Sequence, residues 1–287
     1  MLTKFLRSLI AGRPAPGPDE LYRQALECVQ QGDLRRAAEL CRLATADADF
    51  LQAHQLLAAI ELPGENYVAV IDRLHAHLRP ATYVEIGVAS GATFRRVRPE
   101  TIALGIDPHP KLEGTLPSNH RVFAETSDAF FAGHDVIAEL GGRRIELAFI
   151  DGMHVLEYAL RDFANIERLC APGAVVLLHD CYPLDRRTAS RERATLFSSG
   201  DVWRLVLLLR KHRPDLCIRT IGTPPTGLGM ILNLDPSSRL LSERHDSLVA
   251  EFLALDYRVL DERKGEQLAL FPNHWPAIAA LIDGRMR

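Results

Sequence analysis

The segment from Glu85 to Gly91 (EIGVASG) has the residue types of a ligand-binding turn. Gly87 and Gly91 let the backbone turn tightly and approach a ligand without a Cβ clash, and the amides that start a following helix can meet a polar or anionic group. The spacing is ExGxxxG, with Ala89 where a dinucleotide-binding motif has its middle glycine. We therefore expect this turn to bind a cofactor that lacks a pyrophosphate.

Asp107 follows Gly87 by twenty residues, at the end of the next apolar run. A carboxylate in that place can accept both hydroxyls of a ribose. The turn and the acid together predict an adenosine site. The segment Glu125 to Asp128 (ETSD) follows the third apolar run. Its short polar side chains, Ser127 and Asp128 among them, would either bond an adenine edge or cap a helix.

A second set of residues combines two carboxylates with two imidazoles. Asp151 and Asp180 close the fourth and fifth apolar runs, so a parallel sheet would bring both acids to one rim, beside the adenosine. Asp151, Asp180 and His179 are predicted to hold a divalent cation such as Mg²⁺, which prefers oxygen ligands and promotes deprotonation of a bound hydroxyl. The alternative is that the acids bond loop amides and the histidines pack and accept protons alone. For a base, His154 is the first candidate and His179 the second, because imidazole titrates near working pH.

These side chains need a sheet to position them. From Glu65 onward, helical stretches alternate with short apolar runs. The predicted strands are Thr82 to Gly87, Ile102 to Asp107, Arg121 to Ala124, Ile145 to Asp151 and Ala174 to His179, followed by Cys217 to Ile221 and Met230 to Leu234. Near-continuous apolar strands between helices are typical of a parallel sheet covered on both faces. The expected fold is α/β, a doubly wound, mostly parallel, Rossmann-like sheet over residues 65–287. Further helices are expected at Asn66 to Leu78, Val202 to Lys211 and Ser242 to Leu255.

The region before Glu65 has a different pattern. Residues 1–18 are expected to be a short amphipathic helix over Met1 to Ile10 followed by a Pro- and Gly-rich linker. Residues 19–64 predict a small all-helical extension, with helices at Glu20 to Gln31 and Leu34 to Ala46 and a third from about Gln52. The spacing of its small residues resembles a tetratricopeptide repeat. Because such repeats need neighbours, this segment is expected to pack on the main domain or on another subunit, which makes a homo-oligomer one expected partner.

Four segments in order carry a resemblance to a known family: Tyr83 to Gly91 (YVEIGVASG), Phe149 to Tyr158 (FIDGMHVLEY), Pro172 to Pro183 (PGAVVLLHDCYP) and Thr226 to Gly229 (TGLG). Together they resemble the class I S-adenosylmethionine-dependent methyltransferases of the Methyltransf_24 type, over roughly Asn66 to Pro236. A combination of motifs in order is more specific than any one of them.

The resemblance implies a cofactor, S-adenosylmethionine, and its contacts. Glu85, Gly87 and Gly91 would contact its methionine and ribose portions, Asp107 its ribose hydroxyls, and Ser127 with Asp128 its adenine, while Asp151 would lie beside the sulfur. Similar small-molecule O-methyltransferases have an acid at the ends of the fourth and fifth strands. Some have a second acid directly before the one on the fifth strand, where this chain has His179.

A polar loop from Asp185 to Gly200 follows the fifth strand and contains Arg186, Arg187, Arg191 and Arg193. It is placed to act as a lid. One interpretation is a clamp for an anionic substrate, and the other is a solvated loop balanced by its own acids. The TGLG turn either reaches the same mouth or serves only a hairpin.

Composition narrows the class of protein. The 287-residue chain has a formal net charge of -3 and a pI near 6.4, which gives no general attraction to nucleic acid. Its five cysteines are an odd number without a CxxC pair, which argues against a disulfide framework and favours a cytoplasmic location. No run approaches the length of a membrane span.

The predicted function is O-methylation of a small hydroxylated molecule, a sugar or a secondary metabolite, with or without Mg²⁺. Two alternatives stay open. One is an NAD-type oxidoreductase, disfavoured by Ala89, and the other is a non-catalytic adaptor that recruits partners through its N-terminal helices.

Overall fold

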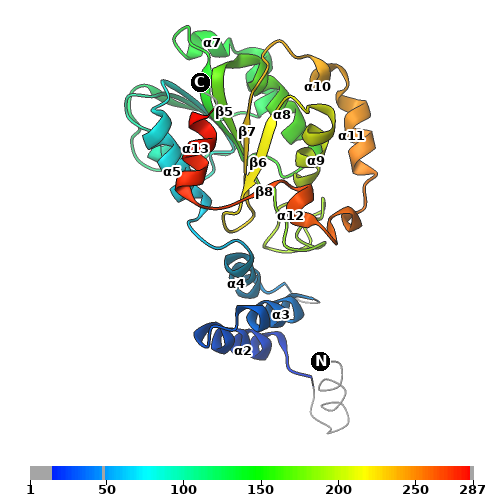
Figure 1. The fold of residues 1–287 in the computed structure, drawn as a ribbon. Coiled ribbons are helices and arrows are strands. Elements are labelled where there is room, and N and C mark those ends of the chain that lie inside the picture. The colour runs from blue at the N-terminus through cyan, green and yellow to red at the C-terminus, as the bar shows by residue number, and fades with distance from the viewer. Residues whose placement is uncertain (1–14, 47–48, 285–287) are drawn as a thin grey trace. The chain divides into compact units, whose positions relative to one another are not determined.

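The computed structural model describes residues 15–46 and 49–284, and its contacts divide the chain into two units (Figure 1). One unit extends to Glu61 and includes Thr195–Phe197, and the other holds the remaining residues from Leu62 onward. The helix predicted over Met1 to Ile10 lies outside the described residues. The predicted domain limits at residues 18 and 64 stay predictions.

Within the described residues of the first unit there are three helices, as the sequence predicted: α2 (Pro18–Gln30), α3 (Leu34–Thr45) and α4 (Leu51–Glu61). Gly32, with φ +78°, ends the α2 turn, and Asp33 caps α3 by accepting a hydrogen bond from the Arg36 amide at 3.0 Å. A glycine stop followed by an aspartate cap is therefore what separates the first two helices. The tetratricopeptide comparison for this unit stays a prediction.

The second unit is built on a sheet whose strands are β1 (Thr82–Ile86), β2 (Ile102–Ile106), β3 (His120–Phe123), β4 (Ile145–Ile150), β5 (Cys170–His179), β6 (Cys217–Ile221), β7 (Leu228–Leu232) and β8 (Leu270–Phe271). In the described part of the chain these eight strands run in the order β3-β2-β1-β4-β5-β7-β6-β8. The first five are parallel, and β7 runs antiparallel to β5 and β6. The predicted doubly wound, mostly parallel sheet is confirmed.

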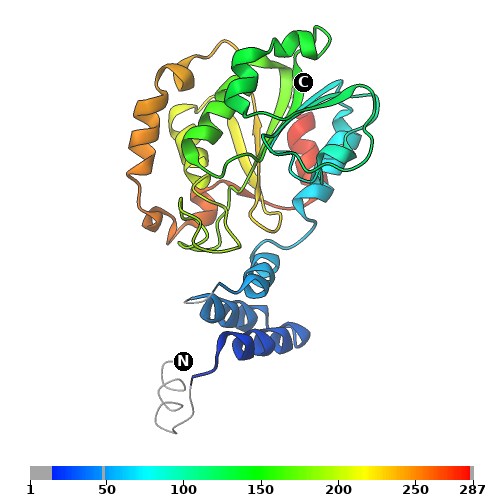
Figure 2. The same cartoon turned by 180° about the vertical axis from the view of Figure 1, so that it is seen from behind.

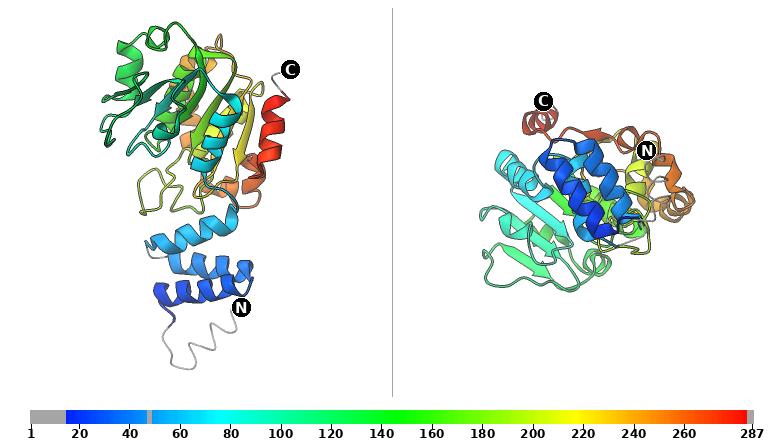
Figure 3. Two further views of the ribbon diagram at one scale, coloured as in Figure 1. Left: turned by 90° about the vertical axis from the view of Figure 1, so that its left-hand side faces the viewer. Right: turned by 90° about the horizontal axis from the view of Figure 1, so that it is seen from below.

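Helices cover both faces of this sheet: in Figure 1, α5 and α13 lie to the left of the strands and α9 and α11 to the right, and Figures 2 and 3 show the same layers from other sides. The helices of the unit are α5 (Tyr67–Leu78), α6 (Ser127–Gly133), α7 (Val136–Glu139), α8 (Leu156–Leu169), α9 (Trp203–His212), α10 (Leu240–Glu243), α11 (His245–Leu253), α12 (Lys264–Gln267) and α13 (Trp275–Asp283), with 3-10 turns η1 (Phe94–Arg96) and η2 (Tyr257–Leu260). Helices α8, α9, α10 and α11 share one apolar core with the sheet, and α5 and α13 share the other. Alternate residues of β1 serve the two cores, with Val84 in the first and Tyr83 in the second.

Some predicted elements differ in detail. The strand expected at Met230 to Leu234 begins two residues earlier, at Leu228, and the helix expected over Ser242 to Leu255 is divided into α10 and α11. Strand β8 and helix α13 had no counterpart in the prediction. Among the described residues, no helix combines the length and apolar character that crossing a bilayer requires.

The strand order reverses at β1, whose neighbours are β2 on one side and β4 on the other. The Gly87 amide donates to the Ile106 carbonyl, and the Asp151 amide donates to the Ile86 carbonyl, both at 2.8 Å. Gly87 has φ +89°, and a Cβ there would lie 1.9 Å from the carbonyl oxygen of Asp151. Only glycine fits this close approach, which brings the ends of β1 and β4 together.

Replacing Gly87 by alanine is expected to destabilise the fold more than the same change at Gly142. Gly142 also has a positive φ, +81°, but nothing lies within 4 Å of its missing Cβ. G142A should cost about 1 kcal/mol, the price of a left-handed alanine. G87A should cost about 1–3 kcal/mol more, because its Cβ collides with backbone. Urea denaturation of both variants measures this, and equal losses would contradict the close contact.

Candidate functional site

A cavity of about 710 Å³ opens at the carboxyl ends of the central strands, within the size range of small-molecule sites. Seven residues that the sequence predicted for the site line it: Gly87, Asp107, Ser127, Asp128, Asp151, His154 and His179. Glu85, Gly91 and Asp180 are not among the lining residues. The lining residues that the sequence did not assign to the site include Met153, Tyr158 and Asp162.

Asp107 is fixed by the turns on either side of it. The Ala89 amide donates to Oδ2 and the His109 amide donates to Oδ1, each at 2.7 Å. Each carboxylate oxygen still has a lone pair for a further donor. Ala89 has φ +46°, a conformation that favours glycine, so the turn after β1 is wound tightly around this carboxylate. Asp107 thus presents two acceptors toward the cavity, as a pair of ribose hydroxyls requires.

Glu85 lies beneath this turn and is fully buried. It accepts hydrogen bonds from the Tyr83 hydroxyl and the Thr93 hydroxyl, both at 2.6 Å. Burial raises the pKa of Glu85 to about 8, although the two hydroxyl donors act in the opposite direction. Gly91 is also set back, and a Cβ at Gly91 would lie 2.6 Å from the Leu112 side chain. In this structure both residues shape the turn from behind the cavity wall.

The start of α6 forms another wall. The Thr126 side chain caps the helix, accepting from the Ala129 amide at 3.2 Å, so Ser127 and Asp128 are not the capping residues. Asp128 pairs with Arg161 at 2.7 Å. The helix cap expected within Glu125 to Asp128 is therefore confirmed at Thr126, while Ser127 and Asp128 line the cavity and their contact with an adenine stays a prediction.

Asp162 is a buried acid on α8 that sequence reasoning missed. It is 3% exposed, and burial raises its pKa to about 7 although the Ser127 side chain bonds to it. The pattern did contain a sign of it, because Asp162 interrupts the apolar face made by Leu160 and Phe163. A buried acid on an apolar helix face is unusual and points to a site.

The second predicted set is brought together. His154 Nδ1 lies 3.0 Å from Asp180 Oδ2, and His154 Nε2 lies 3.6 Å from Asp151 Oδ1. His179 Nδ1 lies 3.1 Å from Asp151 Oδ1 and 3.5 Å from Asp180 Oδ1. Each imidazole thus lies between the same two carboxylates, which close β4 and β5.

Charge is balanced within this cluster. Burial lowers the pKa of His154 and His179, but the two carboxylates outweigh it, raising the pKa of His154 to about 10 and that of His179 well above its usual value. Burial likewise raises the pKa of Asp151 and Asp180, but His179 and His154 hold both below the ordinary value. Both imidazoles therefore carry a proton at neutral pH in this structure.

Two further residues complete the surroundings. The Thr226 hydroxyl, from the TGLG turn, donates to Asp180 Oδ1 at 2.6 Å. The TGLG motif therefore contacts the His–Asp cluster through Thr226. The Tyr67 ring lies over the His179 ring, with centroids 4.2 Å apart. Burial, followed by the nearby Asp151 and Asp180, raises the pKa of Tyr67 to about 12, so it stays a neutral phenol.

Asp151, His154 and Asp180 fit a divalent cation. Their ligand atoms all lie within 4.8 Å of one another. Asp180 Oδ2 is buried and accepts no well-aligned hydrogen bond from any described residue, which leaves it available to a metal. His179, predicted as the third ligand, is not in this set, and His154, predicted first as a base, takes its place.

The arginine-rich loop is held by acids. Arg186 pairs with Asp256 at 2.6 Å, while Arg191 pairs with Glu157 and lies 3.4 Å from Asp201. These two arginines are therefore engaged within the protein, which favours the interpretation of a balanced loop over a clamp for an anionic substrate.

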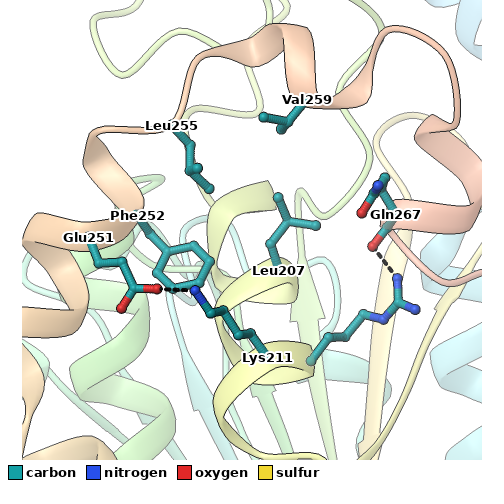
Figure 4. Close-up of a pocket in the computed structure, with 8 residues that line it drawn as sticks. Leu207, Lys211, Glu251, Phe252, Leu255, Val259 and Gln267 are labelled. Carbon is teal, nitrogen blue, oxygen red and sulfur yellow. Dashed lines mark hydrogen bonds and ion pairs between the residues drawn. The ribbon is translucent and has the colours of Figure 1, made fainter.

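A separate cavity of about 380 Å³ lies among α9, α11, η2 and α12 (Figure 4). Leu207 and Leu255 give it an apolar lining. Lys211 pairs with Glu251 at 2.7 Å, and Arg210 donates to the carbonyl of Gln267. Since both cations already have partners, this cavity offers no recognisable site for a charged ligand.

Comparison with known proteins gives a family match. Residues 84–181 match the model of a methyltransferase domain family, Methyltransf_24, which spans β1 to the end of β5. This match contains the cavity turn and the Asp151 to Asp180 cluster, and it confirms the resemblance seen in the sequence. None of the curated proteins compared with the chain matches it.

Solved structures similar to the chain include one cofactor-bound protein and two O-methyltransferases. The cofactor-bound Rv0187 from MTB is 16% identical, with a TM-score of 0.43, over 77% of this chain and 100% of that one. The O-methyltransferase from Bacillus cereus, in complex with SAH, is 14% identical with a TM-score of 0.41, over 63% of this chain and 87% of that one. The O-methyltransferase TomG from Streptomyces achromogenes, in complex with SAM, is 16% identical with a TM-score of 0.35, over 57% of this chain and 78% of that one.

The raised pKa of Glu85 predicts a pH dependence of stability. In the folded protein this carboxyl keeps its proton up to about pH 8, whereas in the unfolded chain it ionises above its ordinary pKa of 4.5. The folded state therefore binds the extra proton between these values, and the free energy of unfolding should fall as pH rises through them.

Urea denaturation of wild type and Glu85→Gln at pH 5 and pH 8 tests this. The wild type should lose on the order of 3–5 kcal/mol relative to the variant over this interval, at about 1.4 kcal/mol for each unit of pKa shift. Glu100→Gln is the control, because Glu100 is 70% exposed in its pair with Arg98. A pH dependence that is the same in wild type and Glu85→Gln would refute the buried, proton-binding carboxyl.

Proposed function

We propose that this protein, whose residues 84–181 are a methyltransferase domain, transfers a methyl group from S-adenosylmethionine to an oxygen of a small hydroxylated molecule, such as a sugar or a secondary metabolite. The observation that carries the proposal is that Asp107 and two members of the Asp151–His154–Asp180 cluster, Asp151 and His154, line one end-of-strand cavity. The first suits the nucleoside of the cofactor, and the second suits activation of a hydroxyl.

The cofactor would lie along the cavity from the turn at Gly87 to the start of α6. Asp107 would accept the ribose hydroxyls with its two remaining lone pairs, and Ser127 and Asp128 would meet the adenine. S-Adenosylmethionine carries a positive sulfonium and a positive ammonium. The acids along the cavity, Asp107, Asp151 and Asp162, give it a polarity that favours such a ligand.

Transfer of the methyl group would depend mainly on alignment. A sulfonium is already activated, so the site has to hold acceptor oxygen, methyl carbon and sulfur in line and keep water away. Tyr67 and His179 form a partly apolar wall next to the carboxylates, which limits water there. Asp151 lines the cavity near this wall and can orient the acceptor.

Asp151, His154 and Asp180 would hold a divalent cation such as Mg²⁺. When bound, the cation would lower the pKa of a coordinated hydroxyl and so favour the alkoxide. Thr226 donates to Oδ1 of Asp180 and so leaves Oδ2 as the oxygen for the metal. His179, which bonds Asp151, would hold that ligand in place. As the second candidate base, it would accept a proton only once a bound cation offsets the carboxylates that raise its pKa.

Binding of S-adenosylhomocysteine to Asp107→Ala tests the cofactor assignment. Wild type should bind by isothermal titration calorimetry, and the variant should bind at least about 100-fold more weakly, because two hydrogen bonds to a charged acceptor are lost. Asp256→Ala is the control, since Asp256 pairs with Arg186 and does not line the cavity. Equal affinity of Asp107→Ala and wild type would exclude the proposed cofactor site, and absence of binding in wild type would favour the adaptor alternative.

Titration of Mn²⁺, followed by electron paramagnetic resonance, tests the cation. Asp180→Asn should lower Mn²⁺ affinity by at least about tenfold, because even losing a residue that supports a ligand costs about 10–100-fold. Asp162→Asn is the matched control, being a buried acid of the same cavity outside the cluster. If Asp162→Asn weakened Mn²⁺ as much as Asp180→Asn, the cation would be responding to general negative charge and the assigned ligand set would be wrong.

A further inference from the structure

Gly200, the last residue of the arginine-rich loop, lies directly against the loop that bears His154. A Cβ on Gly200 would lie 1.9 Å from the His154 carbonyl oxygen, and Gly200 has φ +59°. Only glycine allows the two backbones to approach this closely. The next residue, Asp201, is fully buried.

Asp201 serves as the N-terminal cap of α8. The residue in the cap position, Val155, has no side-chain acceptor, so the first amides of the helix need a partner from elsewhere. The Leu156 amide donates to Asp201 Oδ1 at 2.7 Å, from 45 residues away. A carboxylate at this end of a helix is also favoured by the helix dipole.

Asp201 also contacts the backbone of His154. The Asp201 amide donates to the His154 carbonyl at 3.1 Å. Asp201 therefore makes two hydrogen bonds to this backbone. Its amide bonds His154, and its side chain bonds Leu156. Because the backbone position of His154 sets where its ring can reach, these bonds bear on the contacts of the ring with Asp151 and Asp180.

Burial raises the pKa of Asp201, and two nearby cations act against this effect. Arg191 lies 3.4 Å from Oδ2 while it also pairs with Glu157 at the start of α8, and Arg204 lies 3.8 Å away. A buried carboxylate is costly unless it is paired and hydrogen-bonded, and here both conditions are met. This gives the arginine-rich loop a role through Arg191 that requires no anionic substrate.

We propose that Asp201 is a positioning residue for the candidate site: it fixes the backbone of His154 so that the imidazole faces the carboxylates of Asp151 and Asp180. The importance of that orientation rests on the proposed function. The orientation itself depends only on the contacts between Asp201 and the segment from His154 to Leu156.

Histidine side-chain NMR of the full chain tests the proposal, with His154→Gln to assign the ring signals of His154. In Asp201→Ala the His154 signals should shift or broaden, while the signals of His75 and His120, buried elsewhere, stay in place. Asp201→Asn, which keeps an oxygen for the Leu156 amide, should leave the His154 signals close to those of wild type. Mn²⁺ affinity should fall about tenfold or more in Asp201→Ala, as for other residues that support a ligand, and less in Asp201→Asn.

Asp135→Ala is the matched control, because Asp135 caps α7 in the same way, accepting from the Ala138 amide at 3.1 Å. It should lower the melting temperature without moving the His154 signals. If Asp201→Ala likewise lowered the melting temperature and left those signals in place, Asp201 would be a structural cap only and the proposal would be overturned. Should Asp201→Ala not fold, Gly200→Ala takes its place, because its Cβ pushes on the His154 carbonyl, and unmoved His154 signals there would also overturn it.

The outcome is separate from that of the proposed function. Shifted His154 signals in a protein that binds neither Mn²⁺ nor S-adenosylhomocysteine would support the positioning role and reject the methyltransferase site. Binding of both ligands by wild type, with unmoved His154 signals in Asp201→Ala, would do the reverse.

Discussion

The architecture depends on one close approach between two backbones, where the chain leaves β1 at Gly87 and passes the carbonyl of Asp151 at the end of β4. The sheet changes its direction of winding at this point, and the chain segments that follow β1 and β4 diverge to opposite sides. A side chain at Gly87 would fill the gap between them. Because none is present, the turn that holds Asp107 and the loop that holds His154 can border one cavity.

The electrostatic character of the cavity comes from buried acids that are not matched by an equal number of cations. Glu85 behind the turn and Asp162 in the wall are both costly to ionise, and the pKa of each is raised by burial. Only at the carboxyl ends of β4 and β5 do imidazoles balance the acids. The site therefore has one region with few cations and another where the charges of acids and imidazoles balance. The first would suit a cationic cofactor, and the second would suit a neutral acceptor.

The sequence predicted the elements whose pattern is local and missed what depends on packing. Apolar runs located β1, β2, β4 and β5, and the acids that follow the last three of them, Asp107, Asp151 and Asp180, lie at one edge of the sheet. The sequence could not decide between the two imidazoles, because the direction of each ring is set by contacts such as Tyr67 on His179 and by the left-handed Asp180, with φ +61°. Neither has a sequence signature. Glu85 illustrates the same limit. The motif places it at the end of a strand, but it does not show on which side of the cavity wall the carboxylate lies.

The pairing of β5 with β7 shows that the family-matched segment is not a self-sufficient module. Residues 84–181 end just after β5, whose outer edge is covered by β7, Leu228–Leu232, more than forty residues further along the chain. An excised segment would expose that edge to pairing with other chains. It would also lack the carboxylate that completes the first turn of its own longest helix, α8. A truncation at this border would thus leave a fragment with an open strand edge that is prone to aggregation.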